Sequence, residues 1–147
     1  MRVAIGNDHA GVDLRNQLAA DLRAEGHTVD LYGATDTEPY DYPLAADAVA
    51  QAVLNHTDTF GVLVCGSGVG VCIRANRYPG IRAAQCFDVE MAQLARRHNH
   101  ANVLCIGERI QSYADAKTVV EAFLTTEEDH APRHDRRVAL IDAPLKP

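Results

Sequence analysis

The 147-residue sequence predicts a Rossmann-like three-layer α/β/α sandwich around a five-stranded parallel sheet. Short apolar runs alternate with longer segments of helical periodicity, the pattern of parallel strands joined by helices. The apolar run 60–65 is typical of a central strand that is covered on both faces. There is no internal repeat or linker, so we expect one domain over residues 1–147, with residues 125–147 as a C-terminal helical tail.

The first half of the chain alternates strand and helix patterns. Residues 2–6 and the alternating segment at 29–31 are predicted strands. Between them lies a helix over 11–25, indicated by leucines at every fourth position, and Gly26 suits its C-terminal cap. Pro43 fits the first turn of a second helix. The apolar residues of that helix are Leu44, Ala48, Val49, Ala52 and Val53.

The second half repeats this alternation with strands expected at 81–85 and 103–106. Asp88 can cap a helix that carries Met91, Leu94 and Ala95. Ser112 and Asp115 resemble a capping box ahead of a helix that carries Val119, Val120, Phe123 and Leu124. Within the tail, Pro132 begins a last helical stretch that runs through Leu140.

Composition and charge exclude several function classes. The chain has 14 basic and 20 acidic residues and a net charge of −6, which argues against binding to nucleic acid or to an anionic membrane surface. The longest apolar runs are far shorter than the roughly 20 residues that span a bilayer. The first residues lack the apolar stretch of a signal peptide, so we expect a cytoplasmic protein. The four cysteines form no Cys-x-x-Cys pair, which offers neither a zinc knuckle nor a thioredoxin motif.

Ligands of open parallel α/β sheets bind beyond the carboxyl ends of the strands. On that rule we expect three segments to meet in one crevice, namely residues 6–11, 65–70 and 97–99. The middle segment holds Gly66, Gly68 and Gly70, which permit positive φ and a close backbone approach by a ligand. A helix that starts near Gly68 would point its free N–H groups into the crevice and form an anion cradle.

The spacing of this loop does not match three known kinds of phosphate-binding loop. The glycines do not follow Gly-x-Gly-x-x-Gly, and no Gly-Lys-Ser/Thr follows, which disfavours NAD binding and P-loop nucleotide hydrolysis. A cysteine-dependent phosphatase needs an arginine six residues after its cysteine, but Val71 stands there. The remaining interpretation is that Cys65 acts as a base or nucleophile whose thiolate the N–H groups stabilise. The other three cysteines are interpreted as structural residues: Cys72, Cys86 and Cys105.

Polar side chains elsewhere offer further candidates. Asp8 and His9 can supply a carboxylate and an imidazole to the crevice, or simply cap a loop. His98 and His100 suggest a metal, but the sequence places no third ligand near them, so we favour an acid/base role for His98 over zinc. His130 and His134 also mimic a metal pair, which the intervening Pro132 argues against. Arg133 and Arg137 share a helix face and suit a phosphate, or else neutralise Glu127, Glu128 and Asp129.

Taken in order, these segments and a few others resemble ribose-5-phosphate isomerase type B and its wider family, which includes galactose-6-phosphate isomerase subunits. The resemblance runs through nearly the whole chain. It rests on Gly6-x-Asp8-His9-Ala10-Gly11, Asp41-Tyr42-Pro43, Cys65-Gly66-Ser67-Gly68-Val69-Gly70, Ala75-Asn76-Arg77, Gly80-Ile81-Arg82-Ala83, Arg97-His98-Asn99, Gly107-x-Arg109 and Arg133-His134-x-x-Arg137-Val138.

The resemblance implies an interconversion of ribose 5-phosphate and ribulose 5-phosphate through a cis-enediolate, without a metal or organic cofactor. It implies that Cys65 is the base that moves the proton between C2 and C1. His98, assisted by Asp8, would open the furanose ring. The charge on oxygen would be held by the cradle, formed by Gly66, Ser67, Gly68, Val69 and Gly70. Sugar hydroxyls would be bound by Tyr42 and Asn99, and the phosphate by His9, Arg109, Arg133 and Arg137.

Two features refine this expectation. Part of the family has a glutamate base at the position of Val71 and no cysteine at the position of Cys65, so the chain resembles the cysteine-base branch. Family sites are built across a dimer interface, which implies a homodimer or a dimer of dimers with the tail at the interface. Two alternatives remain open: an isomerase of a four- or six-carbon sugar phosphate, and a non-catalytic sugar-phosphate or nucleotide sensor on the same scaffold.

Overall fold

The computed structural model describes residues 1–144 and contains one parallel sheet of five strands in the order β2-β1-β3-β5-β4. The strands are β1 (Arg2–Asn7), β2 (Thr28–Gly33), β3 (Thr59–Cys65), β4 (Ala83–Gln85) and β5 (Val103–Gly107). The order in which successive strands are added to the sheet reverses at β1. The parallel strands β2 and β3 therefore lie on opposite sides of it. In sheets of this kind the ligand crevice forms at such a reversal.

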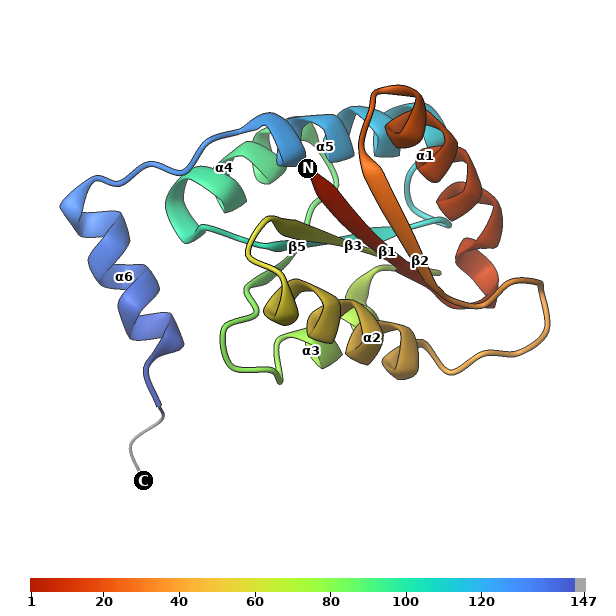
Figure 1. Cartoon of the computed structure of the whole chain (residues 1–147), viewed down its shortest axis with the longest axis horizontal. Helices are drawn as coiled ribbons and strands as arrows, with labels where there is room; N and C mark the ends of the chain where they lie inside the picture. Colours follow the sequence, from red (N-terminus) through yellow and green to blue (C-terminus); the bar gives the residue numbers. More distant parts are fainter. Residues whose placement is uncertain (145–147) are drawn as a thin grey trace.

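Helices cover both faces of the sheet, as the sequence predicts (Figure 1). The elements are a short 3-10 turn η1 (His9–Gly11), α1 (Val12–Ala24), α2 (Tyr42–Asn55), α3 (Val69–Ala75), α4 (Val89–Asn99), α5 (Tyr113–Thr125) and α6 (Pro132–Asp142). In Figure 1, α1, α4 and α5 lie above the sheet and α2 and α3 below it, while α6 stands beside these layers. No helix within residues 1–144 combines the length and the apolar character needed to cross a membrane.

Two apolar cores follow from the alternation of side chains along the strands. Val3, Ile5 and Val62 belong to the core beneath α1, α4 and α5. Ala4 and Leu63, which alternate with them, belong to the core above α2 and α3. Because every second residue of a central strand enters a different core, β1, β3 and β5 are buried on both faces.

Most helix ends lie where the sequence predicts them. Gly26 takes a φ of +89° after α1, Asp88 accepts a hydrogen bond from the N–H of Met91, and Ser112 does the same for Asp115. The strand expected from residue 81 begins only at Ala83, because the N–H of Ile81 instead closes a turn onto the carbonyl of Tyr78. The last helix continues past the expected residue 140 to residue 142, and residues 145–147 of the expected tail lie outside the described part.

Candidate active site

Three loops converge where β1, β3 and β5 end. The sheet register pairs Asn7 with Val64 and Cys65 with Gly107, so the residues that follow these strands leave the sheet side by side. The Asp8 N–H donates to the carbonyl of Val64 at 3.2 Å, and the Glu108 N–H donates to the carbonyl of Cys65 at 3.0 Å. Backbone hydrogen bonds therefore fix the spacing of the loops before any side chain takes part.

These loops surround a cavity of about 610 Å³. Most of the residues that the sequence predicts for a site line it, and the apolar side chains of α3 and of the β5–α5 loop close one wall. The lining residues are Asp8, His9, Ala10, Tyr42, Cys65, Gly66, Ser67, Val69, Gly70, Ile73, Arg109 and Ile110.

Cys65 is the last residue of β3, and its side chain is only 5% exposed. Its Sγ accepts a hydrogen bond from the N–H of Gly68 at 3.1 Å. Gly68 is the N-cap of α3, whose first N–H groups have no partner within the helix and carry partial positive charge. The next N–H of the loop, that of Val69, donates to Ser67 Oγ at 3.3 Å, so among the described residues it is the Gly68 N–H that bonds to the sulfur.

The three glycines of this loop differ in what a side chain would meet at each position. Only Gly68 has positive φ, at +79°, and an added Cβ there would lie 2.9 Å from the carbonyl carbon of Ile106. Gly70 packs under Tyr42, whose ring would lie 2.6 Å from an added Cβ. A Cβ on Gly66 would be 3.4 Å from the Arg109 side chain, which is ordinary contact. Of the three glycines that permit positive φ, Gly68 is the one that adopts it.

A histidine and an arginine, His9 and Arg109, line the cavity. The Tyr40 N–H donates to Nδ1 of His9 at 3.2 Å, which places the proton of a neutral His9 ring on Nε2. The Arg109 backbone is fixed by its N–H bond to the Gly66 carbonyl at 3.0 Å, and its guanidinium lies against Gly66. Within residues 1–144 Arg109 has no ion-pair partner. Its charge is available to an anion in the cavity.

Asp8 is buried and caps the η1 turn, since its Oδ1 accepts from the Ala10 N–H at 2.9 Å. The capping interpretation of Asp8 is therefore correct, and its carboxylate nevertheless lines the cavity. Behind it, burial raises the pKa of Glu108, with smaller contributions from Asp13 and Asp8. A carboxyl with a raised pKa thus lies next to the cavity wall.

His98 and Asn99 do not lie at the cavity. They end α4 and precede β5, and therefore lie at the amino edge of the sheet, opposite Cys65. From Val103 to Gly107 the strand advances about 13 Å at roughly 3.3 Å per residue, which separates the two edges. The expectation that 97–99 shares a crevice with the other loops is wrong within one chain, because a helix-to-strand loop lies at the opposite end from a strand-to-helix loop.

His98 has a close neighbour that the sequence does not indicate. Its ring stacks on that of His134 with centroids 4.3 Å apart and planes 6° from parallel. His134 is 3% exposed, neither of its ring nitrogens has a hydrogen-bond partner in the described residues, and Nε2 lies 3.5 Å from Asp129 Oδ2. Burial, followed by His98, lowers the pKa of His134.

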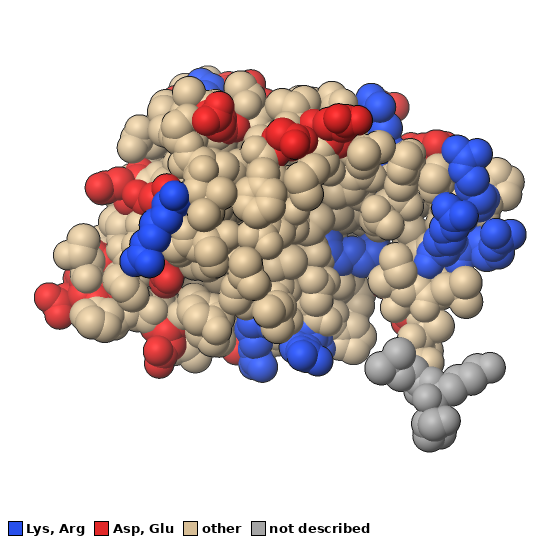
Figure 2. Space-filling view, turned by 180° about the vertical axis from the view of Figure 1, so that it is seen from behind, with Lys and Arg blue, Asp and Glu red and all other residues tan. Residues whose placement is uncertain are grey.

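Arg133 and Arg137 project from α6 into solvent and, within residues 1–144, form no ion pair with Glu127, Glu128 or Asp129. Figure 2 shows a group of basic side chains over α6, above the grey C-terminal atoms. The Ala131 N–H does most to lower the pKa of Asp129, and Arg133 contributes to this at longer range, so both interpretations of these arginines stay predictions. The two arginines form an exposed cationic face that no anion of the described chain covers.

The remaining cysteines differ from one another. Cys86 and Cys105 are buried, and burial raises the pKa of Cys86 to about 12 and that of Cys105 well above its ordinary value. Cys72 is only partly buried, and a hydrogen bond from Cys105 does most to lower its pKa to about 7. The structural interpretation fits Cys86 and Cys105, whereas Cys72 has the acidity of a reactive thiol.

Sequence reasoning missed several residues of this region. Ile73 lies four residues after Val69 on α3, and Ile110 follows Arg109, so helical spacing and adjacency to a candidate could have indicated both. The statement that no third ligand lies near His98 and His100 is also wrong. Two three-residue clusters form there with residues from the α5–α6 segment and α6: His98, Asp129 and His134, and His100, His130 and Asp135.

The same chain was compared with known proteins. The family model for Ribose/Galactose Isomerase matches residues 3–141. The Ribose-5-phosphate isomerase B of Mycolicibacterium paratuberculosis is 42% identical over 96% of this chain and 89% of its own length. That of Escherichia coli is 40% identical over 97% and 95%. The D-erythrulose-4-phosphate isomerase of Pectobacterium atrosepticum is 41% identical over 86% and 84%.

Solved structures agree with these matches. The Ribose-5-Phosphate Isomerase B of Clostridium thermocellum superposes with a TM-score of 0.93 at 39% identity, covering 97% of this chain and 95% of that chain. The protein from Thermotoga maritima gives 0.92 at 42% identity, covering 96% and 97%. The fold is thus shared along nearly the full length. The chain belongs to the ribose/galactose isomerase family.

Proposed function

We propose that this protein interconverts D-ribose 5-phosphate and D-ribulose 5-phosphate, a reaction of pentose phosphate metabolism, with Cys65 as the base and without a metal or organic cofactor in the reaction. The observation that carries the proposal is the position of the Cys65 sulfur. It lies at the floor of a cavity rimmed by His9 and Arg109 and accepts a hydrogen bond from a helix N-cap at 3.1 Å. This arrangement places a sulfur with a backbone N–H donor in the same cavity as the groups proposed to hold the phosphate.

In this mechanism a single base, Cys65, both removes the proton from C2 and returns it to C1. The thiolate takes the proton from C2 of the open-chain aldose, and the electron pair of that C–H bond forms the C1–C2 double bond while negative charge moves to O1. The thiol then returns the proton to C1, the O2 proton passes to O1, and the C2–O2 double bond forms. The first-turn N–H groups of α3 and the Ser67 hydroxyl stabilise the enediolate, an effect worth about 10²–10³ in rate per donor.

The other candidates have complementary roles in this proposal. Asp8 and His98 open the furanose ring by moving the proton between O1 and the ring oxygen. Tyr42 and Asn99 bind sugar hydroxyls. The phosphate dianion is held by side chains that have no ion-pair partner among the described residues: His9, Arg109, Arg133 and Arg137.

This assignment requires a homodimer whose sites combine two chains. His98 and Asn99 lie at the sheet edge opposite Cys65, and Arg133 and Arg137 lie on α6, which stands apart from the cavity (Figure 1). A two-fold axis that brings α4 and α6 of one chain over the cavity of the other would complete both sites at once. The exposed apolar residues of α2, α3 and α6 suit such an interface: Leu44, Leu54, Ile73, Leu140 and Ile141.

A second candidate is isomerisation of a four-carbon sugar phosphate. It is favoured by the 41% identity to a protein named D-erythrulose-4-phosphate isomerase. Ile73 and Ile110 form an apolar part of the cavity wall. Comparing kcat/KM for four-, five- and six-carbon phosphates decides between the two substrates, and the higher value identifies the physiological class.

The proposed reaction is tested by isotope exchange. Wild-type protein incubated with ribulose 5-phosphate in deuterated water should place deuterium on C1, because the enediolate is reprotonated from a thiol in contact with solvent. A protein that only binds sugar phosphates shows no exchange, and such a result would exclude catalysis. The Cys65→Ala variant should bind the substrate but not exchange, and exchange at the wild-type rate would remove Cys65 as the base.

A further inference from the structure

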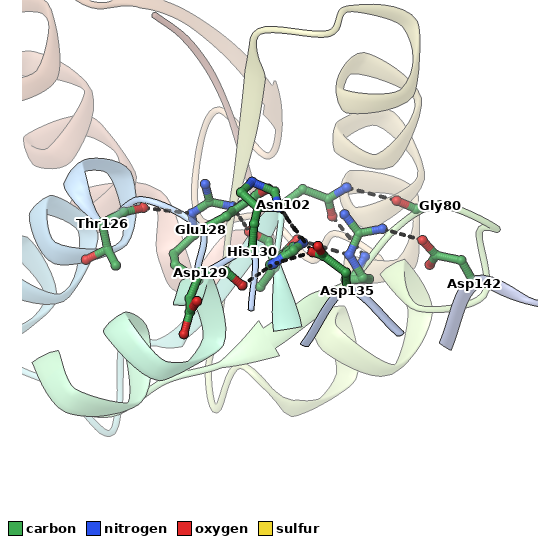
Figure 3. Close-up of polar contacts among 12 residues, drawn as sticks. Gly80, Asn102, Thr126, Glu128, Asp129, His130, Asp135 and Asp142 are labelled. Atoms are coloured by element: carbon green, nitrogen blue, oxygen red, sulfur yellow. Dashed lines mark hydrogen bonds and ion pairs between the residues drawn. The ribbon is translucent and has the colours of Figure 1, made fainter. Parts of the chain in front are cut away.

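The α6 helix is attached to the rest of the chain almost entirely by polar contacts. Its only buried residue is His134. The Arg82 Nη1 pairs with Asp142 at its C-terminal end at 2.7 Å, and the segment before it is held by Arg96 Nη1 and Glu128 at 3.1 Å. Figure 3 shows polar contacts around Glu128, Asp129, His130 and Asp135, with Asp142 farther along on the right. Little apolar burial holds α6, so additional bonds at its first turn would change its stability markedly.

Three potential metal ligands meet at that first turn. His100 follows α4, His130 precedes α6 and Asp135 lies in the first turn of α6. One ring nitrogen of each histidine and one carboxylate oxygen lie within 4.8 Å of one another. Nδ1 of His130 is 3.1 Å, and Nε2 of His100 is 3.9 Å, from the same Oδ1 of Asp135. Ligand atoms around tetrahedral zinc are about 3.3 Å apart, given bonds of about 2.0–2.1 Å.

The orientation of the rings separates this cluster from its neighbour. An imidazole nitrogen binds a metal in the plane of its ring. His98 and His134 are stacked 6° from parallel, so their ring planes do not meet at a shared ion. His100 and His130 are inclined at 64° with centroids 5.0 Å apart, so their in-plane lone pairs can converge. Geometry therefore favours the cluster of His100, His130 and Asp135.

Glu128 lies next to both histidines of this cluster, on the side away from Asp135. Its Oε2 lies 3.6 Å from Nδ1 of His100 and 3.8 Å from Nε2 of His130, which are the nitrogens that face away from Asp135. Histidine ligands commonly donate their second N–H to a carboxylate, which orients the ring and makes it a stronger ligand. The Asp129 carbonyl also lies 3.3 Å from Nε2 of His100 and offers an oxygen on the side of Asp135.

We propose that His100, His130 and Asp135 bind a divalent transition-metal ion of the zinc type and thereby fasten the start of α6 to the end of α4. Two imidazoles and a carboxylate match the ligand preference of zinc, and the exposed sides of His130 and Asp135 leave room for a water as the fourth ligand. His100 is 6% exposed and held in place, whereas His130 is exposed and can close the last distance to the ion. None of the three ligands lines the cavity of Cys65 in the same chain, and the proposal does not depend on the proposed reaction.

Zinc binding to untagged, metal-free protein tests this site. Calorimetry with ZnCl2 should give about one ion per chain with micromolar affinity or tighter. At saturating zinc Tm should rise by about 5 °C. Cobalt(II) should give the visible absorption of a four-coordinate site without a thiolate charge-transfer band, which distinguishes it from binding at the cysteines.

The variants are chosen so that folding does not confuse the result. His130→Ala alters a side chain that is 68% exposed, and Asp135→Asn keeps the size of the side chain, so both variants should fold. Each variant should weaken zinc binding at least tenfold and abolish the rise in Tm. His56→Ala, at an exposed histidine outside both clusters, is the matched control and should bind like wild type. Absence of zinc binding at 100 µM or so, or undiminished binding by both site variants, overturns the proposal.

Discussion

The sulfur of Cys65 and the N–H of Gly68 are joined by a hydrogen bond of 3.1 Å, across the turn between β3 and α3. Gly68 takes this turn with φ of +79°, and a Cβ there would meet the β5 backbone. The acceptor is a side chain and the donor is a helix N-cap, so the turn that ends the central strand also solvates a charge on sulfur. The base of the proposed reaction and its electrostatic support thus come from one stretch of four residues.

Replacing Cys65 by Ser tests the base with little change in shape. We expect kcat to fall by about 10²–10⁴, since a serine hydroxyl is far less acidic than a thiol and supplies almost no anionic base near neutral pH, while the affinity for inorganic phosphate stays unchanged. Steady-state kinetics and phosphate binding by calorimetry measure the two effects. Loss of phosphate binding together with activity would show that the variant distorts the cavity and would contradict a purely chemical role.

The shared site predicts that two inactive variants restore each other. In a mixed dimer of Cys65→Ala and His98→Asn chains, one site receives both mutations and the other receives none. After random exchange, half of the dimers are mixed, so about a quarter of wild-type activity should return. If both residues served the site within one chain, mixing would restore nothing. Each variant incubated with itself provides the baseline.

Gly70 and Tyr42 predict a coupled pair of mutations. In Gly70→Ala the new Cβ would lie 2.6 Å from the Tyr42 ring, and we expect a loss of about 1–3 kcal/mol in the free energy of unfolding. Removing the ring in the double variant Tyr42→Ala/Gly70→Ala should recover most of that loss. Gly66→Ala, with its nearest contact at 3.4 Å, is the matched control and should cost much less. Strictly additive denaturation energies would contradict the clash.

Local patterns were sufficient for the fold and for one half of the site. The glycine turn after the central strand located the cavity, and the caps at Asp88 and Ser112 located their helices, because each depends on neighbours a few residues away. The rule that ligands bind at the carboxyl ends of strands does not apply to His98, because His98 precedes a strand and lies at the amino edge of the sheet. Its partners Asp129 and His134 come from segments about thirty residues later, and no periodicity reports a contact of that range.

Cys72 provides a prediction about acidity outside the cavity. Its pKa of about 7 has the hydrogen bond from Cys105 as its largest cause, opposed by burial and aided by the Gln85 backbone and by Asn76. Because the lowered pKa leaves Cys72 largely as thiolate above neutral pH, its alkylation rate should rise with pH around a midpoint near 7, whereas Cys86, with a pKa of about 12, should stay unreactive.

Peptide mass spectrometry after timed treatment with iodoacetamide measures both residues in one sample. The Cys105→Ala variant removes the first cause and should move the Cys72 midpoint upward, while the same treatment of Cys65→Ser checks that labelling at Cys65 does not alter the profile of Cys72. A midpoint of Cys72 that stays near 7 without Cys105 would show that the hydrogen bond is not responsible. Equal rates for Cys72 and Cys86 at every pH would contradict the acidity itself, since Cys72 has hydrogen-bond partners that lower its pKa whereas burial raises the pKa of Cys86.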